Sequence, residues 1–73
     1  MNVERIGAAA GVIWERLSRD GELTLSELKK TPCDFTVDEV VAGLGWLARE
    51  GKVSIGVRSR RYYVSLVGEV AAL

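Results

Sequence analysis

Two helix starts of the same design lie twelve residues apart, and they constrain the fold of this 73-residue chain more than any other feature. Thr24-Leu25-Ser26-Glu27 and Thr36-Val37-Asp38-Glu39 both match the capping box, in which threonine and glutamate each accept a hydrogen bond from the other's backbone N–H. They predict a short helix over residues 25–31, ended by Pro32, and a second helix over residues 37–50, ended by Gly51.

A longer helix is predicted over residues 3–19, before these two, and Gly21 suits its left-handed C-terminal cap. Its apolar stripe at helical spacing consists of Ile6, Ala9, Ala10, Ile13 and Leu17. The opposite face is smooth, because it carries Gly7, Ala8 and Gly11. Each glycine costs a helix up to about 1 kcal/mol. We therefore expect another backbone to approach this face closely, and we take these three residues as a candidate protein interface.

The segment over residues 53–66 alternates apolar and polar residues in two runs, and one antiparallel register satisfies both runs. Val57 then lies opposite Tyr62, Ile55 opposite Val64 and Val53 opposite Leu66. The other face pairs Ser54 with Ser65, Gly56 with Tyr63 and Arg58 with Arg61. Because the tip contains neither Gly nor Asn, we expect a four-residue turn instead of a tight primed turn.

The predicted order is helix, short strand at residues 22–24, helix, helix and β-hairpin, which is the order of a winged helix-turn-helix. We expect one domain over residues 1–73, of the α+β class and mostly helical. Four segments carry a resemblance to a known family: "ERIGAAAGVIWERL", "GELTLSELKK", "GLGWLAREGKV" and "RRYYVSL". The chain resembles a family of small free-standing winged helix-turn-helix proteins from bacteria and archaea, catalogued as a domain of unknown function. The resemblance implies the fold and a homodimer, and it assigns no functional residues.

The residue inventory argues against an enzyme. The chain has no histidine and one cysteine, Cys33, so it lacks a zinc ligand set and a base to activate a thiol. Cys33 is interpreted as a small packed residue in a turn. The Gly43-Leu44-Gly45-Trp46-Leu47-Ala48 run matches a dinucleotide-binding pattern, but it lies inside a predicted helix instead of at a helix start. We expect no cofactor, no metal and no small-molecule ligand.

The predicted location is the cytoplasm. A single cysteine forms no intrachain disulfide, which fits a reducing compartment. The uncharged run over residues 6–14 is too short to span a membrane and lacks the flanks of a signal peptide, so it is interpreted as part of a mature helix. We expect no membrane association.

Positive charge gathers in the second half of a chain whose net charge is zero. Residues 1–40 carry five Lys/Arg and eight Asp/Glu, a net charge of −3, whereas residues 41–73 carry five and two, a net charge of +3. Arg58 opposite Arg61 would repel, which favours an anion between them. The candidate contacts to DNA phosphates are Arg58, Arg60, Arg61, Lys52, Arg49, Lys29 and Lys30. The alternative is a solvated hairpin tip.

The helix over residues 37–50 takes the place of a DNA recognition helix. Its predicted buried stripe is Val37, Val40, Val41, Leu44, Leu47 and Ala48, and its other face carries Asp38, Glu39 and Trp46. Two acids at the N-terminal end argue against base reading, which favours Arg, Lys, Asn and Gln. Trp46 is either a protein-interface residue or packs on the hairpin beside Tyr63.

Two functions therefore stay open. The first is a regulator-like module that binds double-stranded DNA weakly and salt-sensitively through the wing, as a homodimer. The second is a protein-interaction or homodimerisation module without DNA binding, whose interface comprises Gly7, Ala8, Gly11 and Trp46.

Overall fold

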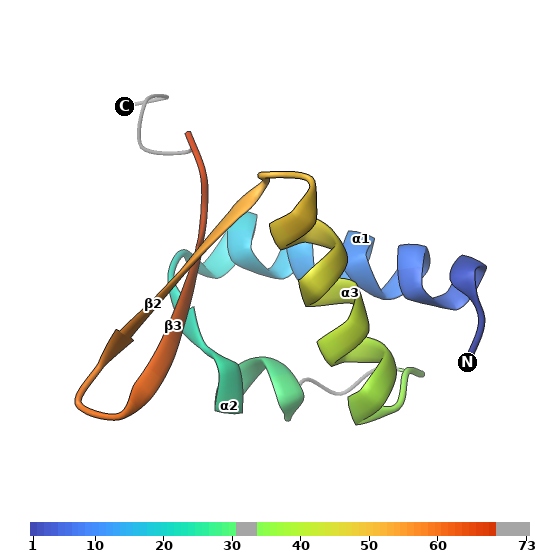
Figure 1. Ribbon diagram of the computed structural model, residues 1–73, viewed down its shortest axis with the longest axis horizontal. Helices are drawn as coiled ribbons and strands as arrows, with labels where there is room; N and C mark the ends of the chain where they lie inside the picture. The colour runs from blue at the N-terminus through green and yellow to red at the C-terminus, as the bar shows by residue number, and fades with distance from the viewer. Residues whose placement is uncertain (31–33, 69–73) are drawn as a thin grey trace.

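The computed structural model describes residues 1–30 and 34–68. Its elements are α1 (Val3–Asp20), β1 (Leu23–Thr24), α2 (Leu25–Lys29), α3 (Val37–Arg49), β2 (Val53–Arg58) and β3 (Arg61–Leu66). Figure 1 shows α3 crossing α1, with the β2–β3 hairpin beside the helices and its tip at the same edge of the molecule as α2. The predicted α+β winged helix-turn-helix fold is confirmed. The predictions for Thr31, Pro32, Cys33 and residues 69–73 lie outside the described residues.

Both predicted capping boxes form and start their helices. The Thr24 hydroxyl accepts a hydrogen bond from the Glu27 N–H at 3.1 Å, and the Glu27 carboxylate accepts one from the Thr24 N–H at 2.8 Å. The corresponding distances for Thr36 and Glu39 are 3.1 and 2.9 Å. Gly21 ends α1 with a φ of 77° and a ψ of −149°, so it takes the positive φ that favours glycine but not the left-handed helical conformation that the sequence predicts. The boundaries of the helices thus follow from residues at their own ends.

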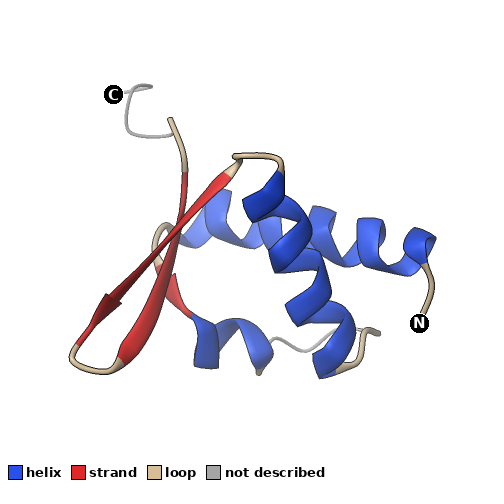
Figure 2. Ribbon diagram, viewed as in Figure 1, coloured by secondary structure: helices blue, strands red, loops and turns tan. Residues whose placement is uncertain are grey.

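The three strands form one antiparallel sheet in the order β1-β3-β2 (Figure 2). All six predicted pairs of the hairpin are confirmed, from Val53 opposite Leu66 to Arg58 opposite Arg61. Near the base of the hairpin Val53, Val64 and Leu66 are buried, whereas Val57 and Tyr62 near the tip are exposed. The base of the hairpin is therefore anchored in the core, and its tip projects as a wing.

The wing turn is tighter than the sequence predicts. Ser59 and Arg60 alone connect the two strands, and their φ angles are 50° and 66°. Positive φ at both central residues is the property of a primed two-residue turn, so the predicted four-residue turn is wrong. Left-handed φ costs a residue with a side chain roughly 1–2 kcal/mol. The buried pairs at the hairpin base fix the register and leave only two residues for the connection, so the ladder overrides the local preference.

The buried face of α3 is rotated relative to the predicted stripe. Val40, Leu44 and Leu47 are buried as predicted, but Val37, Val41 and Ala48 are exposed. Their place in the interior is taken by Glu39 and Gly43. The sequence predicts Glu39 on the outer face, but the residue is buried because it has an arginine partner on α1, described below.

Gly43 explains the rotation, because it is where α3 meets α1. A Cβ atom added at Gly43 would lie 2.8 Å from the backbone nitrogen of Ala10 and 3.2 Å from the Cβ of Ala9. Only glycine permits this approach. Gly43 therefore serves the packing of α3 against α1, in line with the interpretation of the glycine pattern at residues 43–48 as a coincidental match.

The smooth face of α1 is not covered by the rest of the described chain. Cβ atoms added at Gly7 and Gly11 would have nothing within 4 Å, so no described backbone of the chain itself approaches this face. On the opposite face Ala9, Ala10, Ile13 and Leu17 are buried as predicted, and Ile6 is half-buried. None of the described helices is long and apolar enough to cross a bilayer.

Candidate nucleic-acid interface

Four basic side chains border one groove between α2 and the tip of the wing. The groove has a volume of about 500 Å³ and is lined by Thr24, Leu25, Ser26, Lys29, Lys30, Arg60, Arg61 and Tyr62. No carboxylate occurs among these described lining residues. We call this surface the basic groove.

The basic groove joins two segments that are thirty residues apart in the sequence. β1 pairs with β3, with Thr24 opposite Tyr63, and this pairing holds the start of α2 against the wing. The capping box at Thr24 then fixes the direction of α2, so that Lys29 in its last turn and Lys30 at its C-cap border the groove. The tight turn brings Arg60 and Arg61 to the opposite wall.

The basic residues fall into two sets by their partners. Arg5, Arg16, Arg19 and Arg58 are each ion-paired with a carboxylate. Within residues 1–30 and 34–68, the cations without an ion pair are Lys29, Lys30, Arg49, Lys52, Arg60 and Arg61. Four of these six lie in the basic groove, which is therefore a concentration of uncompensated positive charge.

Arg58 has a role that its sequence position does not reveal. It lies opposite Arg61 in the ladder, as predicted, but its guanidinium pairs with Glu22 and stacks 3.9 Å from the centre of the Tyr63 ring. It does not line the basic groove. The structure therefore does not group Arg58 with Arg61 in the basic groove, where Arg61 lies instead with Arg60, Lys29 and Lys30.

Two other candidates lie at the opposite end of the hairpin. Arg49 is the last residue of α3, and Lys52 immediately precedes β2. Six strand residues separate them from the tip, a distance of roughly 20 Å. Neither lines the basic groove.

A second groove runs along the smooth face of α1. It has a volume of about 380 Å³ and is lined by Gly7, Ala10, Gly11, Trp14, Glu15, Trp46, Leu47 and Lys52. Trp14 is 44% exposed and Trp46 is 49% exposed. We call it the tryptophan groove. The structure thus brings three of the four predicted interface residues together, while Ala8 is exposed on the same helix and does not line the groove.

Sequence reasoning missed Trp14 as a member of this surface. Gly7, Gly11 and Trp14 follow the spacing i, i+4, i+7, which places them on one helix face. This signal was available in the sequence. The position of Trp46 needed the structure: it lies beside α1, and its alternative neighbour Tyr63 instead lies under Arg58.

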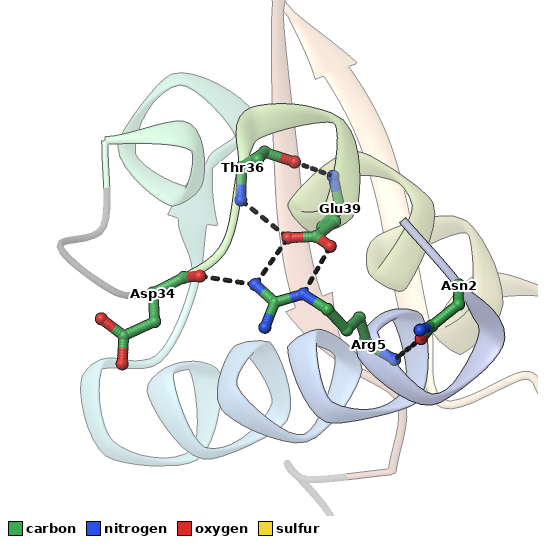
Figure 3. Close-up of polar contacts among 5 residues, drawn as sticks. All are labelled: Asn2, Arg5, Asp34, Thr36 and Glu39. Carbon is green, nitrogen blue, oxygen red and sulfur yellow. Dashed lines mark hydrogen bonds and ion pairs between the residues drawn. The ribbon is translucent and has the colours of Figure 1, made fainter.

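A buried carboxylate ties the start of α3 to α1. Figure 3 shows the Arg5 guanidinium between the Glu39 carboxylate and the Asp34 carbonyl. Arg5 Nε donates to Glu39 Oε2 at 2.6 Å and its terminal nitrogen donates to Oε1 at 2.9 Å, a two-pronged ion pair. The same terminal nitrogen donates to the Asp34 carbonyl oxygen at 2.6 Å. Glu39 is only 3% exposed.

These contacts hold Glu39 in its charged form. The hydrogen bond from Arg5, followed by the one from the Thr36 backbone N–H, lowers the pKa of Glu39 from 4.5 to about 2. The capping box predicted the Thr36 contact. The Arg5 contact joins residues 34 positions apart, and no local pattern announces it.

Glu39 is therefore expected to make the stability of the fold decrease at acid pH. Because its pKa is lower in the folded state, its contribution is fully present above pH 4.5 and is lost as the pH falls from 4.5 through about 2. Glu39→Gln keeps the capping box, since glutamine also serves at this position, but loses the ion pair. We expect this variant to melt at a lower temperature at pH 7 and to lose less stability than wild type between pH 4.5 and 2.

Thermal unfolding followed by circular dichroism over this pH range measures the difference. Glu27→Gln is the matched control, because Glu27 occupies the same capping-box position in α2 but is exposed. We expect a smaller change from Glu27→Gln than from Glu39→Gln. Equal losses of stability between pH 4.5 and 2 in wild type and Glu39→Gln would contradict this role of Glu39.

The comparisons with known proteins agree with this fold. No curated protein matches the chain. A family model described as "Winged helix-turn-helix domain (DUF2582)" matches residues 1–66 of the 73, a stretch that includes all three helices and the wing. The chain therefore belongs to this family of winged helix-turn-helix domains.

Proposed function

We propose that this protein is a DNA-binding module that grips the phosphate backbone of duplex DNA in the basic groove. The observation that carries the proposal is the convergence of Lys29, Lys30, Arg60 and Arg61, all without an ion pair among the described residues, on one groove. Positive side chains on a wing and an adjacent helix are the electrostatic footprint of a nucleic-acid binder.

The side chains around the groove suit phosphate chemically. The guanidinium groups of Arg60 and Arg61 can each donate two parallel hydrogen bonds to one phosphate, whereas the lysines act as point charges. Ser26 adds a hydroxyl donor at the groove. Tyr62 is 52% exposed and offers its ring for stacking against a sugar or a base.

The expected affinity is weak and depends strongly on salt. The net charge of the whole chain is zero, so the attraction comes from this local patch alone. Four phosphate contacts give a slope of log affinity against log salt of about −3.6. Binding without base reading has dissociation constants of about 10⁻⁴ to 10⁻⁶ M at physiological salt.

Fluorescence anisotropy of a labelled duplex of arbitrary sequence, titrated with the protein at several salt concentrations, tests the proposal. Between about 50 and about 200 mM salt we expect the affinity to fall about 150-fold. Absence of binding at the lowest salt concentration would overturn the proposal, and so would binding that does not respond to salt.

A second candidate function, a protein-interaction module that forms a homodimer, is favoured by the tryptophan groove. Two half-exposed tryptophans from different helices border a glycine-lined surface, and aromatic residues of this kind dominate interface energies. Glu15 and Lys52 also line the groove. In a two-fold symmetric interface, a contact of Glu15 in one copy with Lys52 in the other is repeated in the reverse sense, so this charge pair can be self-complementary. A second copy is therefore the proposed occupant.

Analytical ultracentrifugation tests the homodimer. Trp46→Ala is expected to raise its dissociation constant about 30-fold or more. Gly11→Glu is expected to release monomers, because it places a charged side chain in the groove. Ser26→Glu introduces the same charge on an exposed position of α2, away from the tryptophan groove, and should leave the dimer unchanged. A wild-type chain that stays monomeric at high concentration would contradict this candidate.

A further inference from the structure

Base reading by a winged helix-turn-helix requires particular side chains on α3. The N-terminal turns of this helix are the part that the fold presents to the major groove. The strongest discrimination between bases there comes from paired hydrogen bonds from Arg, Lys, Asn or Gln. Asp or Glu accepting from cytosine, single Ser or Thr contacts, and apolar contact with the thymine methyl group are the further ways. The outward-facing residues of α3 therefore decide whether this chain can read a sequence.

The outer face of α3 carries no Arg, Lys, Asn or Gln side chain over its first three turns. Its exposed residues there are Val37, Asp38, Val41, Gly45 and Trp46, and Trp46 lines the tryptophan groove with α1. α3 is described from end to end, and its only polar residues before Arg49 in the last turn are Asp38 and Glu39. Neither donates a hydrogen bond to a base when ionised.

Glu39 is withdrawn from any contact with DNA. It is 3% exposed, both of its carboxylate oxygens accept hydrogen bonds from Arg5, and one also accepts from the Thr36 N–H. Of the two acids that could accept from cytosine, only Asp38 stays outside. Its negative charge opposes a close approach to phosphates.

The basic groove does not supply the recognition of base order that α3 lacks. Lys29 and Lys30 are point charges suited to phosphates. Arg60 and Arg61 sit on a wing, and arginines that enter a minor groove distinguish at most A·T from G·C pairs and the groove width. The groove therefore responds to base composition at most, and not to base order.

From this we infer that the protein binds duplex DNA without reading base order. The basic groove binds the phosphates, and α3 makes no base-specific contacts. The inference rests on the DNA-binding function proposed above. Base-reading regulators bind their sites about 10³- to 10⁷-fold more tightly than other DNA. For this protein we expect dissociation constants within about threefold across duplexes that have one composition and length but scrambled order.

The test measures anisotropy at low salt on such a scrambled set and adds selection from a randomised duplex pool. We expect similar affinities and no enriched motif. Asp38→Ala should raise the affinity for every member by one common factor, because it removes a negative charge and no base contact. Arg60→Ala should lower all affinities alike and reduce the salt slope by about 0.9.

The outcomes separate the two proposals. An enriched motif that binds 100-fold more tightly than its scrambled versions would overturn the inference and leave the DNA-binding function standing. An Asp38→Ala change confined to duplexes with cytosine at one position would also overturn it. Absence of binding to every duplex would overturn both.

Discussion

Replacing both Arg60 and Arg61 by glutamate is expected to lower the affinity for duplex DNA by at least about 100-fold while leaving the fold intact. Charged hydrogen bonds contribute about 1.5–3 kcal/mol each, and the variant loses two such contacts and gains two repulsive charges. The salt slope should also fall by about 1.8. Both residues are exposed at the wing tip, outside the hydrophobic core, so their replacement does not disturb the packing.

The matched control is Arg49→Glu with Lys52→Glu. It changes the net charge by the same amount, and both residues also lack an ion pair within the described ranges. They lie at the far end of the hairpin, roughly 20 Å from the tip. We expect less than about a fivefold loss of affinity, through long-range screened electrostatics alone. Equal losses in the two double variants would mean that net charge, and not the basic groove, governs binding.

Gly43→Val is expected to cause a large loss of stability. The added side chain would meet the backbone of α1, where even a Cβ atom would lie 2.8 Å from the Ala10 nitrogen. A helix backbone cannot yield as a flexible side chain does, so α1 and α3 must separate. We expect the free energy of unfolding to fall by about 3 kcal/mol. This is a large share of the total stability, which for a domain of 73 residues is about 4–11 kcal/mol.

Gly45→Val provides the control within the same helix. A Cβ atom at Gly45 has nothing within 4 Å, so valine there changes only helix propensity. We expect its free energy of unfolding to stay within about 0.5 kcal/mol of wild type. Urea denaturation of the three proteins measures the difference. Similar values for the two variants would contradict the close crossing at Gly43.

The parts of the fold that follow from neighbouring residues could be predicted from the sequence. The capping boxes, the glycine cap of α1 and the six hairpin pairs depend on interactions within one element or one hairpin. The face of α3 could not be predicted in the same way. Hydrophobicity alone places Val37 and Val41 inside, but the approach of α1 at Gly43 and the Arg5–Glu39 pair are contacts between distant segments, and they rotate the helix.

The candidate site divides along the same line. Lys29, Lys30, Arg60 and Arg61 were predicted from charge alone, and the structure places them around one groove. The sequence could not show that Arg58 is held by Glu22, because that pair spans 36 residues. At the wing turn, the residue types alone predict a longer turn. The strand register, which the buried pairs at the hairpin base fix, leaves only Ser59 and Arg60 for the connection.

Amide NMR titration of the labelled protein with a duplex of arbitrary sequence, at low and then physiological salt, tests the central claim most directly. We predict shifts at Ser26, Lys29 and Lys30 on one wall of the groove and at Arg60, Arg61 and Tyr62 on the other, fading as salt rises. Amides of the tryptophan groove should not move. Absence of shifts at low salt would contradict the phosphate grip, and shifts centred on Trp14 and Trp46 would place the contact on the other groove.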